Sequence, residues 1–213
     1  MIDIEAQIDA VHRQTGTRPV GDREAKTVLL RRDYAAQVSD VWDALTDGER
    51  ISRWFLPVTG DLKLGGHYQL KGNAGGEIVA CEPPRLLRVT WVMGEQAEGD
   101  MSKVEVRLTP DGDRTRFELE HAATVPPEFW GQFGPGAVGV GWDGALLGLA
   151  LHLETGEGVS DPDAWSASEE GRSFYTRSAE AWGDAHEAAG ASSEDAAAAA
   201  AATTSFYAPP QES

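Results

Sequence analysis

Residues 103–121 read KVEVRLTPDGDRTRFELEH, and this stretch decides the fold. Apolar and polar side chains alternate on both sides of a Pro-Asp-Gly-Asp turn at residues 110–113. A period of two predicts two antiparallel strands, each with one buried and one exposed face. Arg and Glu occupy the outer face, where they can pair across the strands. The predicted inward residues are Val104, Val106, Leu108, Thr115, Phe117, Leu119 and His121.

The alternation extends upstream to Pro57, with glycine or proline between the runs at the spacing of an antiparallel meander. An apolar, β-branched run at residues 26–34 suits a first strand. Two short helical patterns follow it, within residues 39–55. The sequence therefore predicts a curved antiparallel sheet of six to seven strands.

Downstream of the sheet, the apolar spacing becomes that of a helix. Val138, Trp142, Leu146, Leu149 and Leu153 form one apolar stripe, which predicts a long helix. Glycines inside this helix each cost about 1 kcal/mol relative to alanine, so we expect close packing of its backbone against the sheet. The fold class is thus α+β, a sheet wrapped on one long helix in a helix-grip arrangement. The glycines are Gly139, Gly141, Gly144 and Gly148.

Further helices are predicted after the long helix. Phe174, Trp182 and Ala185 form an amphipathic stripe that we expect to pack on the same domain or on a second copy of the chain, as a homodimer. An alanine-rich run near the C-terminus has high helix propensity and little to bury. The predicted division is an N-terminal arm (1–25), a helix-grip ligand-binding domain (26–155), a helical extension (156–190) and a partly mobile tail (191–213).

Charge and composition exclude some partners. The formal net charge of −17 repels phosphate backbones and anionic lipid, so we expect neither nucleic acid nor membrane as a partner. Residues 1–25 lack the basic and apolar regions of a signal peptide, and no apolar run approaches the ~18 residues of a membrane span. We expect an acidic, cytoplasmic protein. Its single cysteine, Cys81, cannot form an intrachain disulfide and suits the core.

Signatures of catalysis and of metal binding are weak. The five histidines show no metal-ligand spacing, and no nucleophile elbow, phosphate-binding loop or dinucleotide fingerprint occurs. We therefore expect no cofactor and no metal, and a binding protein in preference to an enzyme. His121 is the inward polar residue of interest, suited to proton transfer or to a hydrogen bond with a bound oxygen, or else a capped strand-end histidine.

Aromatic side chains carry the main functional signal. They fall on inward positions of nearly every element, which fits either an ordinary core or the wall of an apolar ligand site between sheet and helix. We expect such a site, closed by residues 57–61 and 124–136, to take a small hydrophobic or aromatic molecule. The predicted ligand-binding residues are Trp54, Phe55, Tyr68, Trp91, Phe117, His121, Trp142 and Leu146.

An ordered set of motifs resembles the family named for the activator of the ninety-kilodalton heat-shock protein (Hsp) ATPase. The resemblance covers about residues 26–155, and the set is more specific than any one motif. Residues 160–213 have no counterpart in the eukaryotic activator. The motifs are VWDALTD at 41–47, WF-x-P at 54–57, DLKLGG at 61–66, EPP-x-LL at 82–87 with Trp91, and GW at 141–142.

That family belongs to the START-like (SRPBCC) superfamily of lipid-transfer domains, birch-pollen-allergen-like proteins and polyketide cyclases. The resemblance implies the helix-grip fold. It leaves function open, because one scaffold carries different activities. Three alternatives follow: a carrier of a hydrophobic molecule, a polyketide cyclase or aromatase that uses His121 with a neighbouring carboxylate, and a co-chaperone or other protein-interaction module.

Overall fold

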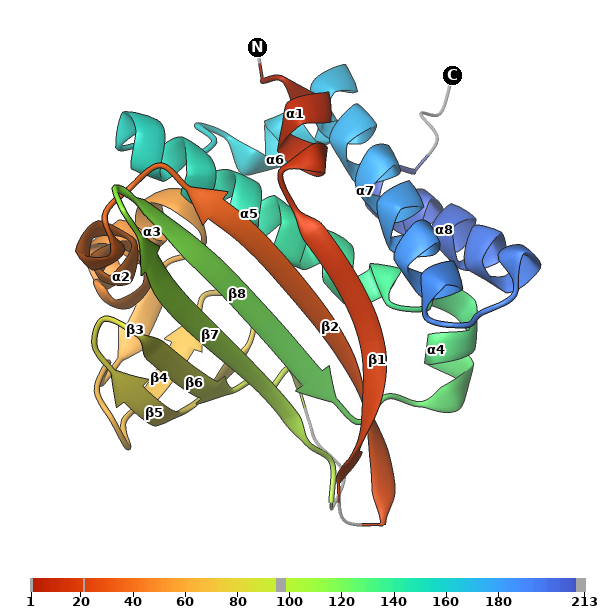
Figure 1. The fold of residues 1–213 in the computed structure, drawn as a ribbon, viewed down its shortest axis with the longest axis horizontal. Helices are drawn as coiled ribbons and strands as arrows, with labels where there is room; N and C mark the ends of the chain where they lie inside the picture. The colour runs from red at the N-terminus through yellow and green to blue at the C-terminus, as the bar shows by residue number, and fades with distance from the viewer. Residues whose placement is uncertain (1, 21, 95–98, 210–213) are drawn as a thin grey trace.

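The computed structural model describes residues 2–20, 22–94 and 99–209. Within these ranges one antiparallel sheet of eight strands curves around the helix α5, in the order β1-β2-β8-β7-β6-β5-β4-β3 (Figure 1). The strands are β1 His12–Val20, β2 Arg23–Tyr34, β3 Val58–Gly60, β4 His67–Leu70, β5 Gly75–Glu82, β6 Leu86–Thr90, β7 Ser102–Asp111 and β8 Arg114–Ala123. The helices are α1 Ile4–Asp9, α2 Val38–Thr46, α3 Gly48–Trp54, α4 Pro127–Phe133, α5 Gly136–Thr155, α6 Pro162–Ala167, α7 Glu169–Ala188 and α8 Ser193–Tyr207.

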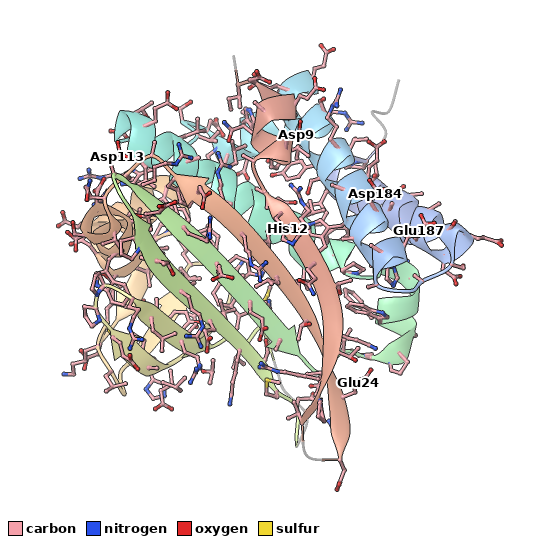
Figure 2. The ribbon with its side chains drawn as sticks, in the orientation of Figure 1. Asp9, His12, Glu24, Asp113, Asp184 and Glu187 are labelled. Carbon is pink, nitrogen blue, oxygen red and sulfur yellow. The ribbon has the colours of Figure 1, made fainter. Side chains whose placement is uncertain are left out.

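The alternating stretch forms β7 and β8, which pair with Val106 opposite Leu119. All of its predicted inward residues are buried, which confirms the assignment of faces. The outer face carries the expected charged pairs, and Figure 2 shows this face with its side chains. Arg31 lies 2.6 Å from Glu118, joining β2 to β8. Because both side chains of this pair are partly exposed to solvent, it contributes no more than about 1 kcal/mol.

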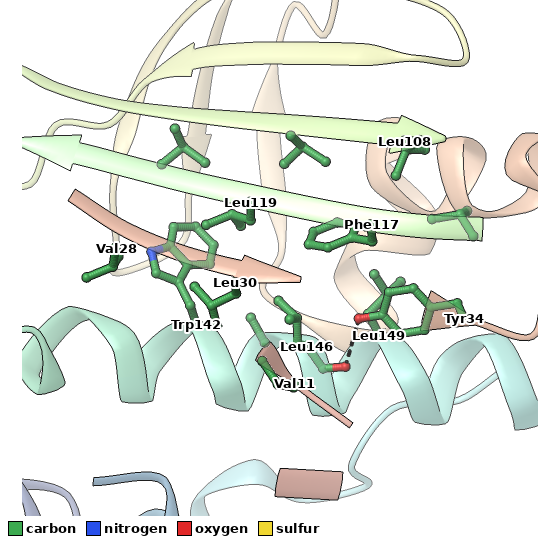
Figure 3. Close-up of a cluster of buried hydrophobic side chains, with 14 of the residues drawn as sticks. Val11, Val28, Leu30, Tyr34, Leu108, Phe117, Leu119, Trp142, Leu146 and Leu149 are labelled. Carbon is green, nitrogen blue, oxygen red and sulfur yellow. Dashed lines mark hydrogen bonds between the residues drawn. The ribbon is translucent and has the colours of Figure 1, made fainter. Parts of the chain in front are cut away.

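The long helix α5 crosses the concave face of the sheet, as predicted. Trp142, Leu146 and Leu149 point from it toward the strands (Figure 3). The hydroxyl of Tyr34, at the end of β2, donates to the backbone oxygen of Leu146 at 3.2 Å. The helix-grip fold expected from the sequence is thus confirmed.

By length and composition α5 is the one described helix that could cross a membrane. However, 61% of its most apolar window is buried inside the fold. Its hydropathy is therefore that of a core helix packed on two sides, by the sheet and by α7.

The N-terminal segment adds a strand to the sheet that the sequence did not predict. Helix α1, at the start of the predicted N-terminal arm, buries Ile8. The chain then continues as β1, which pairs along β2 from His12 opposite Arg31 to Val20 opposite Arg23. The sheet accordingly has eight described strands, where six to seven were expected.

The C-terminal helices pack on the same chain. The stripe of α7 buries Phe174 and Trp182, and α7 contacts both α5 and β1. Helix α8 is continuous over Ser193–Tyr207 and packs on α7 and α4, within the segment 191–213 that the sequence predicted to be a partly mobile tail. Residues 210–213 of the predicted mobile tail lie outside the described residues, and the division into domains stays a prediction.

A buried ion pair ties α7 to the rest of the fold. Asp143, on α5, is 2% exposed. Its Oδ2 atom accepts hydrogen bonds from Arg13 Nε at 2.9 Å, Ser178 Oγ at 2.5 Å and Trp182 Nε1 at 3.0 Å. Burial raises the pKa of Asp143, whereas Arg13 and the two other donors lower it. One carboxylate thus links β1, α5 and α7.

The glycines of α5 pack differently from our expectation. A Cβ atom on Gly139 would lie 2.1 Å from the Trp182 ring of α7, and one on Gly148 would lie 2.4 Å from the backbone oxygen of Trp54. Both glycines therefore allow close contact with helices, not with the sheet. Gly144 has room, because a Cβ atom there would have the Tyr175 ring, at 3.9 Å, as its nearest neighbour.

Alanine substitutions at two of these glycines should have opposite effects. We expect Gly139→Ala to lower the free energy of unfolding by about 1–3 kcal/mol, because its methyl group overlaps the buried Trp182 ring. Gly144→Ala should raise it by up to about 1 kcal/mol, because alanine favours the helix and meets no obstacle. Urea unfolding of both variants checks this. A neutral Gly139→Ala or a destabilised Gly144→Ala would contradict the packing described.

Candidate functional site

An apolar cavity of about 150 Å³ lies between the sheet and α5, beside the end of α3. All the predicted ligand-binding residues except His121 line it. They come from distant parts of the chain, and the curvature of the sheet brings them together. Further lining residues include Ile51, Leu62, Ile78, Cys81, Val89 and Leu119.

Stacked aromatic rings form one wall of the cavity, with Phe55 at their centre. Its ring lies 5.5 Å from that of Trp54, 6.5 Å from that of Trp91 and 6.4 Å from that of Trp142. The indole of Trp54 is held by a hydrogen bond of 2.9 Å to the backbone oxygen of Ala44. Rings at these separations attract one another, so the wall has a defined shape before any ligand arrives.

The hydroxyl groups of the residues that line the cavity form hydrogen bonds within the protein. The Thr46 hydroxyl donates to the Trp42 backbone oxygen at 2.8 Å. The Tyr68 hydroxyl donates to the Thr90 backbone oxygen at 2.7 Å, and burial raises the pKa of Tyr68. Neither carboxylate nor imidazole occurs among the described lining residues. The cavity therefore suits an apolar molecule and offers no charged partner.

His121 lies behind the aromatic wall. Its ring is 6.2 Å from that of Trp91 and 5.9 Å from that of Trp142. Nδ1 accepts a hydrogen bond from Trp142 Nε1 at 3.1 Å, and Nε2 lies 2.8 Å from Ser102 Oγ. Because an indole N–H only donates, Nδ1 carries no proton and Nε2 donates to Ser102.

His121 is accordingly a neutral side chain that positions Trp142. Burial lowers its pKa to about 4. The sequence correctly predicted that His121 points inward. It did not predict the hydrogen bonds that engage both ring nitrogens, and the structure does not bring His121 into the cavity lining.

Of the two segments predicted to close the cavity, 57–61 and 124–136, only the first contributes to its lining. Val58 and Leu62 line the cavity, in or just after the predicted closing segment 57–61. No described residue of 124–136 lines it. Helix α4, within that segment, packs on α8 instead, where Thr203 Oγ1 donates to the Phe133 backbone oxygen at 3.3 Å.

Most of the other lining residues were absent from the predicted site, and Leu62 and Cys81 show two different reasons. Leu62 belongs to the loop between β3 and β4, where no periodic pattern indicates direction. Cys81 was assigned to the core. The register of β5 against β6 shifts between Ile78 and Ala80, and this irregularity lets both Ile78 and Cys81 reach the cavity. No group of three or more potential metal ligands gathers anywhere in 2–20, 22–94 or 99–209.

Comparison with known proteins assigns the family. The profile described as "Activator of Hsp90 ATPase homolog 1-like protein" matches residues 35–154. The chain belongs to this family. CalU16 from Micromonospora echinospora is similar at 38% identity in its crystal structure, with a TM-score of 0.65, over 84% of this chain and 99% of CalU16. The likeness to CalU16 thus extends beyond the segment that the family profile matches.

Two more distant solved structures share the fold. The Aha1 dimer from Colwellia psychrerythraea is 16% identical, with a TM-score of 0.53 over 62% of this chain and 98% of that chain. DynU16, a protein of the dynemicin biosynthetic locus, is 23% identical, with a TM-score of 0.53 over 62% of this chain and 48% of that chain. At these identities the likeness shows the fold alone. No curated protein matches the chain.

Proposed function

We propose that this family member binds a small hydrophobic or aromatic molecule in the cavity between the sheet and α5. The observation that carries the proposal is a preformed apolar space of about 150 Å³ with a wall of stacked rings. Apolar cavities of this size stay free of water and accept about one aromatic ring. A ring-sized apolar molecule is therefore the favoured ligand.

A cyclase or aromatase activity has less support. Such chemistry needs an acid or base within hydrogen-bond reach of the bound molecule. His121 is separated from the cavity by Trp91 and Trp142, and both its nitrogens are already hydrogen bonded. A co-chaperone role is supported only by the family name. The homodimer and the cytoplasmic location stay predictions.

Filling the cavity tests the proposal. We expect fluorobenzene, followed by ¹⁹F NMR titration, to bind the wild-type chain, and Val89→Phe to weaken it by at least about tenfold, because the added ring occupies the same space. Val79→Phe is the matched control. Val79 is 37% exposed on the neighbouring strand β5 and lies outside the lining, so this variant should bind as the wild type does.

The outcomes are distinguishable. Loss of binding in Val89→Phe but not in Val79→Phe supports the cavity as the site. Absence of fluorobenzene binding to the wild type, or equal binding to both variants, would rule the proposal out. Melting temperatures of both variants show whether each remains folded at the temperature of the titration.

A further inference from the structure

A second hollow, here called the outer groove, lies on the side of α5 away from the sheet. Its volume is about 930 Å³. The end of α3, the outward face of α5, the loop after α5, and α6 to α8 enclose it. Gly141 and Gly144 form its floor, and Trp165, Tyr175 and Tyr207 stand beside them. This groove is large enough for a drug-sized molecule, whereas the inner cavity is not.

The groove and the inner cavity share a wall. Trp54, Phe55 and Ala145 line both of them. Trp54 and Phe55 follow one another at the end of α3 and are half-buried. At this point a single layer of side chains therefore separates the two hollows.

The groove differs chemically from the cavity. Its rings stack, with Tyr175 and Tyr207 at 5.5 Å and an interplanar angle of 27°. The groove is also lined by charged side chains of both signs, Arg53, Glu157 and Asp163, and among the described residues none of them forms an ion pair. Rings beside free donors and acceptors suit an uncharged, hydroxyl-bearing group, which can stack and hydrogen bond at once.

At the floor of the groove, no described side chain fills the space beside Gly144. Glycine is unfavourable inside a helix relative to alanine. At Gly139 and Gly148 a tight contact explains the glycine, but a methyl group at Gly144 would meet only Tyr175, at an ordinary 3.9 Å. The backbone of α5 is thus open to the groove at this point, and Gly141 is exposed beside it.

We propose that the outer groove is the second half of the ligand site. This inference rests on the proposed function and specifies its ligand as an amphipathic molecule. The ring-sized apolar end occupies the inner cavity. The larger, uncharged, hydroxyl-bearing part lies along Gly144 and the Tyr175 ring, and the two parts join beside Trp54 and Phe55.

Two probes separate the two halves of the site. Fluorobenzene represents the apolar end alone, and 4-fluorophenyl glucoside adds a hydroxyl-bearing ring. By ¹⁹F NMR on the full chain, the glucoside should bind the wild type at least about tenfold more tightly than fluorobenzene. Gly144→Leu, which fills the groove floor, should remove this advantage and leave fluorobenzene binding unchanged.

Gly131→Leu is the matched control. Gly131 lies on α4 with no atom near its Cβ position and outside both hollows, so this variant should retain the advantage of the glucoside. Ser52→Trp fills the groove from its opposite wall at an exposed position of α3, and should act as Gly144→Leu does even if that variant is unstable.

Equal affinity of the two probes for the wild type would overturn the inference, as would an advantage that survives both groove-filling variants. In that case fluorobenzene binding that is lost in Val89→Phe would leave the proposed function standing. Absence of fluorobenzene binding to the wild type would overturn both.

Discussion

Replacing Asp143 by alanine is expected to lower the free energy of unfolding by about 3–5 kcal/mol. The reason is that the substitution removes the acceptor for three donors at once and leaves the Arg13 guanidinium, whose side chain is 6% exposed, buried without its counter-charge. Urea unfolding monitored by tryptophan fluorescence measures the loss, because Trp182 is one of the three donors.

The control is Asp184→Ala on α7, where the side chain is exposed (Figure 2). It should change stability by no more than about 0.5 kcal/mol. The double variant Arg13→Met with Asp143→Leu should be more stable than Asp143→Ala, because no unpaired charge remains. Equal effects of Asp143→Ala and Asp184→Ala would contradict a structural role of the buried pair.

Acidification from about pH 7 to about pH 4 is expected to destabilise the protein by about 3 kcal/mol through His121 alone. Burial lowers the pKa of His121 from 6.5 to about 4 in the folded protein. Between these values the unfolded chain binds the proton and the folded one does not. Stability is therefore fully present above about pH 6.5 and is lost as the pH falls toward 4.

The variant His121→Gln isolates this contribution, because glutamine can accept from Trp142 and donate to Ser102 but does not titrate. We expect the stability difference between wild type and variant to shrink by about 3 kcal/mol from pH 7 to pH 4. His12→Gln, at an exposed position of β1, serves as the control. A stability difference that stays constant with pH would show that His121 does not cause the loss.

The sequence predicted the central sheet and the long helix because both have one clearly apolar face. The alternation from Val104 to Leu108 and the stripe from Trp142 to Leu149 are the plainest cases. In both stretches the periodic pattern indicates directly which residues are buried, because each inward residue is large and apolar. The same reasoning correctly placed Phe117 and His121 on the inner face of β8.

Strand β1 and helix α8 were not predictable in the same way. In β1 only Thr15 is buried, and Gly16 and Pro19 weaken the strand pattern, as expected of an edge strand. In α8 the buried positions include Ala196 and Ala199 within a run of alanines, so sequence cannot show which face packs.

The features of the site that the sequence could not predict depend on distances between side chains that are far apart in the chain. The approach of Trp142 to His121, and the empty space in front of Phe117, depend on how far the sheet curves from α5. No local pattern records that curvature. The sequence therefore named most of the aromatic residues of the cavity wall but could not show that the cavity is open.

The most direct test of ligand binding in the inner cavity is a crystal structure of the full chain soaked with bromobenzene, whose bromine scatters anomalously. We expect an anomalous peak between Phe55 and Leu119, inside the cavity. A cavity without a peak, with bromine found only on the surface of the protein, would contradict it.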